Sequence, residues 1–226
     1  AFVFQKTAIV FVDGRYTLQV KQQLAPKMFE VGDLIDPGPF GWLAKQTTLA
    51  GQKIGYDARI ISPDALERLR DAARKAGVEL VETENNPIDV AWADRPGEPT
   101  AHVVPHDIAY AGESSSSKRA RLGKQMQDHK IDAAIITSPA SIAWLFNVRG
   151  GDVSRTPLPL GRAFLYAVGQ AELFLAPRKV GSDLGAHLGN EVSLRSTNEL
   201  DRRMAKHQAK RVSVDPSLAS AWFFSA

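Results

Sequence analysis

The chain has 226 residues, of which 44% are hydrophobic and 23% are charged, and its formal net charge is +3. This composition is typical of a folded globular protein and excludes disordered and fibrous classes, and the length suits one large domain or two ordinary ones. The absence of cysteine excludes disulfides, thiolate nucleophiles and cysteine-rich zinc sites, and it favours the cytoplasm. The apolar runs are much shorter than the roughly 20 residues of a membrane span, so no membrane contact is expected.

The first strong pattern is "IVFVDGRYTLQV", at residues 9–20. Its apolar, β-branched beginning predicts a buried strand. Asp13-Gly14 is a common two-residue hairpin turn, so a hairpin is predicted there, with the alternating "TLQV" after it. Two interpretations of Arg15 stay open: a plain turn residue, or a guanidinium that the turn directs at a ligand.

The next elements are a strand at "QKIGYDAR", a helix at "SPDALERLRDAARKAG" and a strand at "VELVET". Ser62 is predicted as the N-cap of the helix, Pro63 suits its first turn, and Gly77 suits its end. Leu66 and Leu69 fall on one face at helical spacing, which predicts an amphipathic helix packed on a sheet.

Residues 85–106 contain four prolines and little periodicity, which predicts a linker and a domain boundary. The predicted domains are 1–98 and 99–226. After the linker we expect a helix that carries Leu122 and Met126 on one side, and then a buried strand at "DAAIITS". The basic runs "SKRARLGK" and "DRRMAKHQAKR" are interpreted as solvated helix faces, so no nucleic acid partner is predicted.

An internal repeat indicates two related units. "KTAIVFVDGRY" is similar to "GQAELFLAPRK", and "KIGYD" is similar to "RVSVD" at nearly the same separation. The predicted fold is therefore α/β, with mixed β-sheets flanked by helices in both units. The second unit opens with the helix and strand of residues 114–137, for which the first unit has no counterpart. We therefore expect the chain to begin inside one domain and to stop inside another.

The candidate chemical groups are sparse. The histidines are scattered, and His102, His106 and His187 are interpreted as structural or solvated, so no metal ligand is predicted. In "WLFNVRGGDV", the residues Arg149 and Asp152 either pair in a structural turn or belong to a loop at a substrate entrance or subunit contact.

Seven strings in this order carry a family resemblance: "FVDGRYTLQV", "IGYDARIISPDALERL", "NPIDVAWADRP", "YAGESSSSKRARL", "SIAWLFNVRGGDVSRTPLPLG", "HLGN" and "VSVDPSLASAW". Together they resemble the N-terminal half of the three-domain Xaa-Pro aminopeptidases (aminopeptidase P). The resemblance implies two creatinase/prolidase N-terminal-type domains, which in that family precede a C-terminal "pita-bread" domain.

That last domain binds two divalent metals, usually manganese, through two Asp, one His and two Glu, and it removes an N-terminal residue that precedes proline. Nothing in this chain matches those ligands, so no catalytic and no metal residue is assigned, and the chain alone is expected to be inactive. The implied role is to shape substrate access and support a homodimer. The implied partners are the pita-bread domain and a peptide with proline at its second position.

The resemblance also implies that Arg15 approaches the active site, and we assign Arg15 and Tyr16 as substrate-binding candidates, with Arg149 as a third. Two alternatives stay open. One is a non-catalytic peptide- or histone-binding module, as in chaperones with creatinase-like domains. The other is a parent enzyme that acts on creatine or another amidine, against which the two-unit N-terminal half argues, because the shorter relatives carry one such unit.

Overall fold

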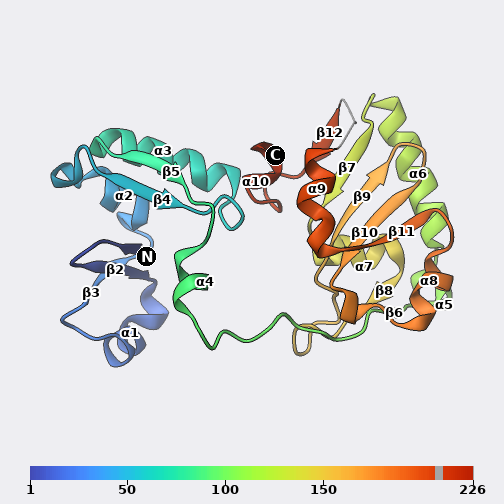
Figure 1. The fold of residues 1–226 in the computed structure, drawn as a ribbon, viewed down its shortest axis with the longest axis horizontal. Coiled ribbons are helices and arrows are strands. Elements are labelled where there is room, and N and C mark those ends of the chain that lie inside the picture. The colour runs from blue at the N-terminus through green and yellow to red at the C-terminus, as the bar shows by residue number, and fades with distance from the viewer. Residues whose placement is uncertain (207–210, 226) are drawn as a thin grey trace. The chain divides into compact units, whose positions relative to one another are not determined.

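The computed structural model describes residues 1–206 and 211–225. They form two compact units, Ala1–Asn86 (unit 1) and Pro87–Ala226 (unit 2), whose elements are labelled in Figure 1. The predicted boundary after residue 98 falls in the extended segment that follows α4 (Pro87–Ala91), and it stays a prediction. Within the described ranges, no helix has both the length and the apolar character that a membrane crossing needs.

Unit 1 contains two small sheets. In the first, β2 (Ala8–Val12) lies between its antiparallel neighbour β1 (Phe2–Val3) and its parallel neighbour β3 (Phe29–Asp33). The second is the parallel pair β4 (Lys53–Tyr56) and β5 (Glu79–Glu82). The helices are α1 (Thr17–Gln23), α2 (Gly38–Ala44) and α3 (Pro63–Ala76).

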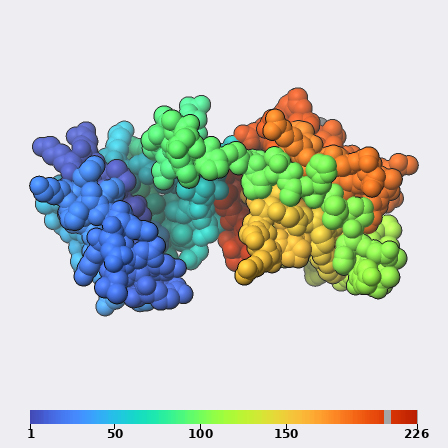
Figure 2. Space-filling model, turned by 90° about the horizontal axis from the view of Figure 1, so that it is seen from below, coloured from blue at the N-terminus to red at the C-terminus, as the bar shows by residue number. Residues whose placement is uncertain are grey.

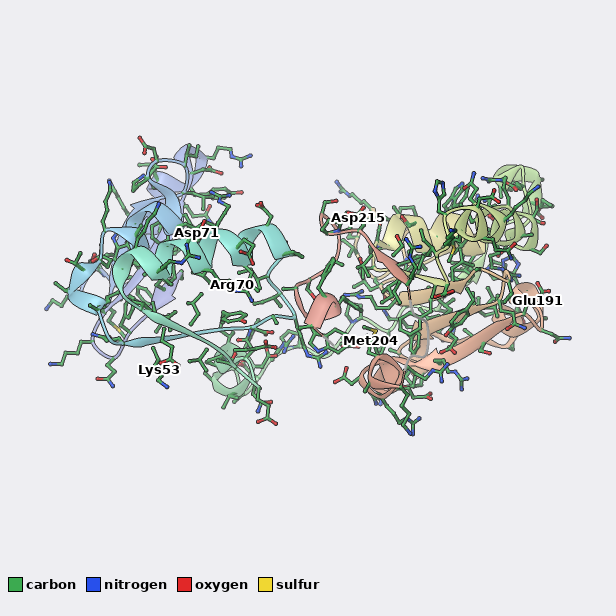
Figure 3. All side chains as sticks on the ribbon, turned by 90° about the horizontal axis from the view of Figure 1, so that it is seen from above. Lys53, Arg70, Asp71, Glu191, Met204 and Asp215 are labelled. Carbon is green, nitrogen blue, oxygen red and sulfur yellow. The ribbon has the colours of Figure 1, made fainter. Side chains whose placement is uncertain are left out.

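Helix α3 has the caps that the sequence predicts. The Ser62 side chain accepts a hydrogen bond from the backbone N–H of Ala65 (3.3 Å), and Gly77 ends the helix in the left-handed conformation. Leu66 and Leu69 are buried. The opposite face carries ion pairs within the helix, and Figure 3 labels Arg70 and Asp71, which pair with Glu67 and Arg74.

The predicted hairpin at Asp13-Gly14 is wrong. The chain enters a 3-10 turn at Gly14–Tyr16 and continues into α1, and β2 pairs in parallel with β3. The Asp13 carboxylate accepts the backbone N–H of Arg15 (2.9 Å) and so caps a helical turn. Parallel neighbours also require a crossover connection, which a two-residue turn cannot supply.

Unit 2 is organised around a five-stranded sheet with the order β11–β10–β9–β7–β12. The β10/β11 and β7/β12 pairs are parallel, and the β9/β10 and β7/β9 pairs are antiparallel, so the sheet is mixed as predicted. The strands are β7 (Ala133–Ile136), β9 (Arg162–Tyr166), β10 (Ala171–Leu175), β11 (Val192–Ser196) and β12 (Val212–Val214).

Helices cover both faces of this sheet. One face packs against α6 (Ser115–Asp128), α7 (Pro139–Phe146) and α8 (Ser182–Leu188), around residues such as Leu165 and Leu173. The other face carries Phe164 and Phe174 under α9 (Leu200–Ala205) and α10 (Trp222–Ser225), and Figure 3 labels Met204 of this second cluster.

A smaller two-stranded sheet completes unit 2. It pairs β6 (Val104–Pro105) with β8 (Val148–Arg149) in antiparallel orientation. The short helix α5 (Ile108–Ala111) follows β6 in the chain. The last part of the segment between α4 and β6 is drawn in green in Figure 2, where it lies on the surface of unit 2. The backbone N–H of Val103 holds the end of this segment to the Lys179 carbonyl (2.9 Å).

The internal repeat is confirmed at the level of topology. β2, α1 and β3 follow one another as β10, α8 and β11 do, and in both series the two strands are parallel neighbours. β4 and β12, which arise from "KIGYD" and "RVSVD", occupy the corresponding later place in each series. The sequence similarity therefore reflects a shared α/β unit.

Candidate functional site

Arg15 lies just beyond the carboxyl end of β2, in the turn that begins at Asp13. Its guanidinium donates two hydrogen bonds to the Asp13 carboxylate, from Nε to Oδ1 (3.1 Å) and from a terminal nitrogen to Oδ2 (2.7 Å). The Arg15 side chain is nevertheless 81% exposed. Asp13 therefore fixes the direction of the guanidinium and leaves its other N–H groups open to a ligand.

The electrostatics of this pair follow from the same contacts. The hydrogen bonds from the Arg15 side chain, and next its backbone N–H, hold the pKa of the Asp13 carboxyl below its usual value. The Asp13 carboxylate in turn raises the pKa of Arg15. Both groups are charged at neutral pH, so the pair offers an oriented cation beside a local anion.

Tyr16 follows directly and is 47% exposed. The Arg15 guanidinium carbon lies 5.8 Å from the centre of the Tyr16 ring, within range of a cation–π contact. The structure therefore brings these two predicted candidates together on one exposed turn of unit 1. Their assignment as substrate-binding residues stays a prediction.

Arg149, the third candidate, lies in unit 2 at the end of β8. Asn147 is the C-cap of helix α7, and its left-handed backbone (φ 50°) leads the chain from the helix into this strand. One terminal nitrogen of Arg149 donates to the carbonyl of its neighbour Val148 (2.9 Å). Arg149 is half-buried.

The predicted alternative that Arg149 pairs with Asp152 is wrong. Asp152 Oδ2 instead accepts hydrogen bonds from Lys179 Nζ (2.7 Å) and from the backbone N–H of Leu160 (2.7 Å). The Asp152 side chain is 0% exposed and that of Lys179 is 3% exposed. The buried carboxylate thus selects a cation from the turn after β10, which is distant in the sequence.

The interpretation of "SKRARLGK" as a solvated helix face is also wrong at two positions. Lys118 and Arg119 are 3% and 2% exposed. Lys118 precedes Leu122 and Met126 by four and eight residues, so it shares their inward face on α6. That spacing was the signal that could have predicted its burial. The second basic run extends over residues 207–210, which lie outside the described residues.

Lys118 links α6 to the end of α7. Its Nζ donates to Asn147 Oδ1 (2.6 Å) and to the Trp144 carbonyl (2.9 Å), and it lies 4.6 Å from the centre of the Trp144 ring. Asn147 also donates to the Glu113 carbonyl (2.8 Å). Burial lowers the pKa of Lys118; Glu113 opposes this effect, whereas the positive charges of Arg149 and Arg121 add to it.

These residues border an open cavity of about 380 Å³ in unit 2. Lys118, Asn147 and Arg149 form its polar side, and aromatic and aliphatic groups form the rest. The lining residues are His106, Tyr110, Ala111, Lys118, Ala140, Ala143, Trp144, Asn147, Arg149, Pro157 and Leu158. This cavity, which sequence reasoning missed, places Arg149 beside a second cation.

Among the described residues, the histidines do not gather with carboxylates into a cluster that could hold a metal ion. His187 Nε2 lies 3.0 Å from the Phe146 carbonyl, and the His106 ring packs beside the Tyr110 ring (5.9 Å between centres). Among the residues that the structure describes, no three His, Asp or Glu side chains converge in a way that could hold a metal ion. The donor set of the described residues therefore does not fit a two-metal site.

Comparisons with known proteins place these features in a family. Residues 94–226 match the family model of the creatinase/prolidase N-terminal domain. Aminopeptidase P1 of Lotus japonicus is 32% identical over 216 residues, which cover 89% of this chain and 32% of the relative. Aminopeptidase P2 of Arabidopsis thaliana is 34% identical over 194 residues, which cover 84% of this chain and 27% of the relative.

A solved structure agrees with the predicted fold. The crystal structure of an X-prolyl aminopeptidase from Caenorhabditis elegans, described as a cytosolic enzyme with a di-nuclear active site, matches with a TM-score of 0.83 and 26% identity. The match covers 97% of this chain and 37% of that one. The chain spans about a third of the length of the curated relatives that it matches. It belongs to the creatinase/prolidase N-terminal domain family.

Proposed function

We propose that this chain is the non-catalytic part of a metal-dependent Xaa-Pro aminopeptidase, which hydrolyses the bond between an N-terminal residue and proline. The observation that carries the proposal is the likeness to the C. elegans enzyme, at a TM-score of 0.83 over 97% of the chain. Curated aminopeptidase P relatives at 32% and 34% identity support the same activity. The two metals, which we propose to be manganese, belong to a separate catalytic domain of the pita-bread type.

In this proposal the two units shape access to the active site. Arg15 and Tyr16 contact the peptide from unit 1, since the guanidinium is exposed and held in place by Asp13. Arg149 contributes from unit 2. We also propose a cytoplasmic enzyme, by analogy with the cytosolic relative.

We further propose that the enzyme is a homodimer, with α4 as a contact surface. This short helix and the residue after it expose three large apolar side chains: Ile88 (64%), Val90 (76%) and Trp92 (48%). The Trp92 backbone N–H donates to the Ile88 carbonyl (2.9 Å), so these two residues lie on the same side of the turn, where neighbouring exposed apolar groups favour a protein contact. A single tryptophan substitution, Trp92→Ser, is expected to shift the full-length enzyme toward the monomer in light scattering.

The decisive experiment compares the 226-residue chain with the product of the complete coding sequence. With Mn²⁺ present, the complete product is expected to release the first residue from an Xaa-Pro peptide, and the 226-residue chain is not. Activity of the 226-residue chain alone would refute its non-catalytic role. A complete product without this activity, or with an acidic tail in place of the two Asp, one His and two Glu, would favour the peptide- or histone-binding alternative.

The role of Arg15 is tested in the complete enzyme by Arg15→Ala, measured as kcat/KM for dipeptides and for longer peptides. We expect kcat/KM to fall about tenfold or more for the substrates whose oxygen atoms Arg15 binds. The matched control is Arg178→Ala, at the corresponding position of the repeat in unit 2. Unchanged kcat/KM for both substrate lengths would leave Arg15 as a structural turn residue.

A further inference from the structure

The cavity beside Arg149 has an unbalanced charge. It is lined by Lys118 and Arg149, and none of the described residues that line it is an aspartate or a glutamate. Buried charges in proteins are normally paired with an opposite charge. Each cation of the cavity would therefore be expected to have a carboxylate partner in unit 2.

Lys118 has no carboxylate partner among the described residues. Its hydrogen bonds go to a backbone carbonyl and to the amide oxygen of Asn147, both neutral, although the side chain is almost fully buried. Glu113 is the acidic group that acts on it electrostatically. The Glu113 carboxylate is itself occupied by Arg121 (2.9 Å) and by the Ser117 hydroxyl (2.8 Å).

Arg149, which is half-buried, also has no carboxylate partner among the described residues. Its side-chain hydrogen bond goes to the neutral carbonyl of Val148. Asp152, the nearest acid in the sequence, is engaged by Lys179. The cavity therefore holds two cations from different elements, α6 and β8, and within the described chain both of them bond to neutral acceptors.

The rest of the cavity is mainly aromatic and aliphatic, with the His106 ring among its lining groups, and it is partly open to solvent. Trp144 is 46% exposed and Tyr110 is 82% exposed, and Pro157 and Leu158 add aliphatic surface. Exposed aromatic rings next to paired donors suit a ligand that joins a small anion to an apolar group. The volume of about 380 Å³ accommodates the end of a peptide.

We propose that this cavity binds the free C-terminal carboxylate of a short peptide, with the last side chain of the peptide against Trp144. The planar fork of Arg149 matches the two oxygens of a carboxylate, and Lys118 adds a second positive charge. The proposed function supplies the reason that the ligand is a peptide; the cavity itself supplies the requirement for the carboxylate.

The test is an NMR titration of the 226-residue chain with Ala-Pro-Ala as the free acid and as its C-terminal amide. The side-chain amide signal of Asn147 is the reporter. We expect the free acid to shift this signal and the amide to bind at least about tenfold more weakly, as expected for loss of charge-assisted hydrogen bonds. Equal binding of the acid and the amide would overturn the proposal.

Three variants sharpen the test. Arg149→Gln is expected to weaken binding of the free acid about tenfold or more and to remove the preference over the amide. Lys118→Met is expected to do the same, but Lys118 also joins two helices, so Arg149→Gln is the primary variant. Lys124→Gln removes an exposed cation of the same helix and is expected to leave the affinity unchanged. An affinity that Arg149→Gln does not alter would overturn the assignment.

Ala-Ala-Ala separates this inference from the proposed function. If the cavity recognises the carboxylate, the free acid of Ala-Ala-Ala is expected to bind with the same affinity as that of Ala-Pro-Ala and with the same preference over its amide. If the acid binds in this way but the complete product is inactive, the proposed carboxylate site would be supported and the proposed aminopeptidase function would be refuted. If the complete enzyme is active but the cavity does not prefer the acid over the amide, only the proposed carboxylate site would be refuted.

Discussion

The two units start from the same repeat but bury it to different extents. Phe11 in β2 corresponds to Phe174 in β10, and each ring contacts a phenylalanine of the antiparallel neighbour, Phe2 in β1 or Phe164 in β9. In unit 2 both rings are 0% exposed and their centres lie 5.1 Å apart. In unit 1 the rings are half-buried and their centres lie 6.0 Å apart.

The difference follows from one additional strand and its helix. In unit 2, β7 lies between β9 and β12 and joins all five strands into one sheet, which α6 and other helices cover. In the described part of unit 1, β1 and β4 belong to separate sheets. A repeat of similar sequence therefore gives a deep core only where neighbouring strands and helices enclose it.

The turns after the corresponding strands differ in burial as the strands do. Arg15 corresponds to Arg178, and Tyr16 corresponds to Lys179. In unit 1 the turn holds an exposed arginine on Asp13, whereas unit 2 has alanine at the position of Asp13. Unit 2 instead buries Lys179 against a carboxylate of its own core. The turn presents a cation outward in unit 1 and stabilises the fold in unit 2.

The largest predicted effect tests the difference in burial. Phe174→Ala is expected to destabilise unit 2 by about 3–5 kcal/mol, because it leaves a cavity beside the fully buried Phe164. Phe11→Ala is expected to destabilise unit 1 by only about 1–2 kcal/mol, because that ring is already in contact with water. Amide hydrogen exchange in β10 and β2 measures the two effects separately.

Each variant is the control for the other, since both remove the same atoms from corresponding strands. Equal losses of stability would mean that unit 1 encloses Phe11 as completely as unit 2 encloses Phe174. A larger loss for Phe11→Ala would reverse the comparison.

An intermediate effect is expected where α6 packs on the sheet. Gly123 is buried, and a Cβ atom added to it would lie 2.7 Å from the Ala167 carbonyl oxygen and 3.2 Å from the Gly169 nitrogen. Both are backbone atoms and cannot move aside cheaply. Gly123→Ala is therefore expected to destabilise the chain by about 1–3 kcal/mol, although alanine favours a helix. Urea denaturation followed by circular dichroism measures this loss.

Gly185 in α8 provides the matched control. It is exposed, and an added Cβ atom would meet nothing within 4 Å. Gly185→Ala is therefore expected to stabilise the chain by about 0.5–1 kcal/mol through helix propensity alone. A stabilising Gly123→Ala would show that α6 does not approach the sheet as closely as the structure has it.

Local chemistry made part of this fold predictable. Ser62 and Gly77 cap α3 by contacts within a few residues, and the repeat reveals the related units because strands and turns repeat in order. The wrong predictions concern residues whose contacts come from distant parts of the sequence. The spacing of Lys118 to Leu122 and Met126 indicates its inward face, but the acceptors of its hydrogen bonds, Asn147 and Trp144, come from more than twenty residues away.

The candidate site was predictable in part for the same reason. Arg15 and Tyr16 stood out as a polar pair after an apolar strand, but the bond from Arg15 to Asp13 required the helical turn that replaced the predicted hairpin. Arg149 could be named from its loop. Its neighbour Lys118 could not, because only the packing of α6 on α7 brings the two to one cavity.

The smallest predicted effect concerns the Asp13–Arg15 pair. Arg15→Ala removes the side-chain hydrogen bonds that lower the pKa of Asp13 most, and it retains the backbone N–H of residue 15, which lowers that pKa next. The pKa of Asp13 is therefore expected to rise part of the way to its usual value, as measured by an NMR titration of the carboxyl carbon.

The sign of the accompanying stability change follows from this direction. Because folding depresses the pKa of Asp13, the pair contributes stability above the unfolded pKa of about 3.9, and that contribution is lost as the pH falls through the folded value. Asp215 is the internal control, since hydrogen bonds from Ser217 lower its pKa without an arginine. Arg15→Ala is expected to leave the pKa of Asp215 unchanged. An unchanged pKa of Asp13 would mean that the Arg15 guanidinium is not held at this turn in solution. Unit 1 would then have no physical reason to present a fixed, outward-facing cation.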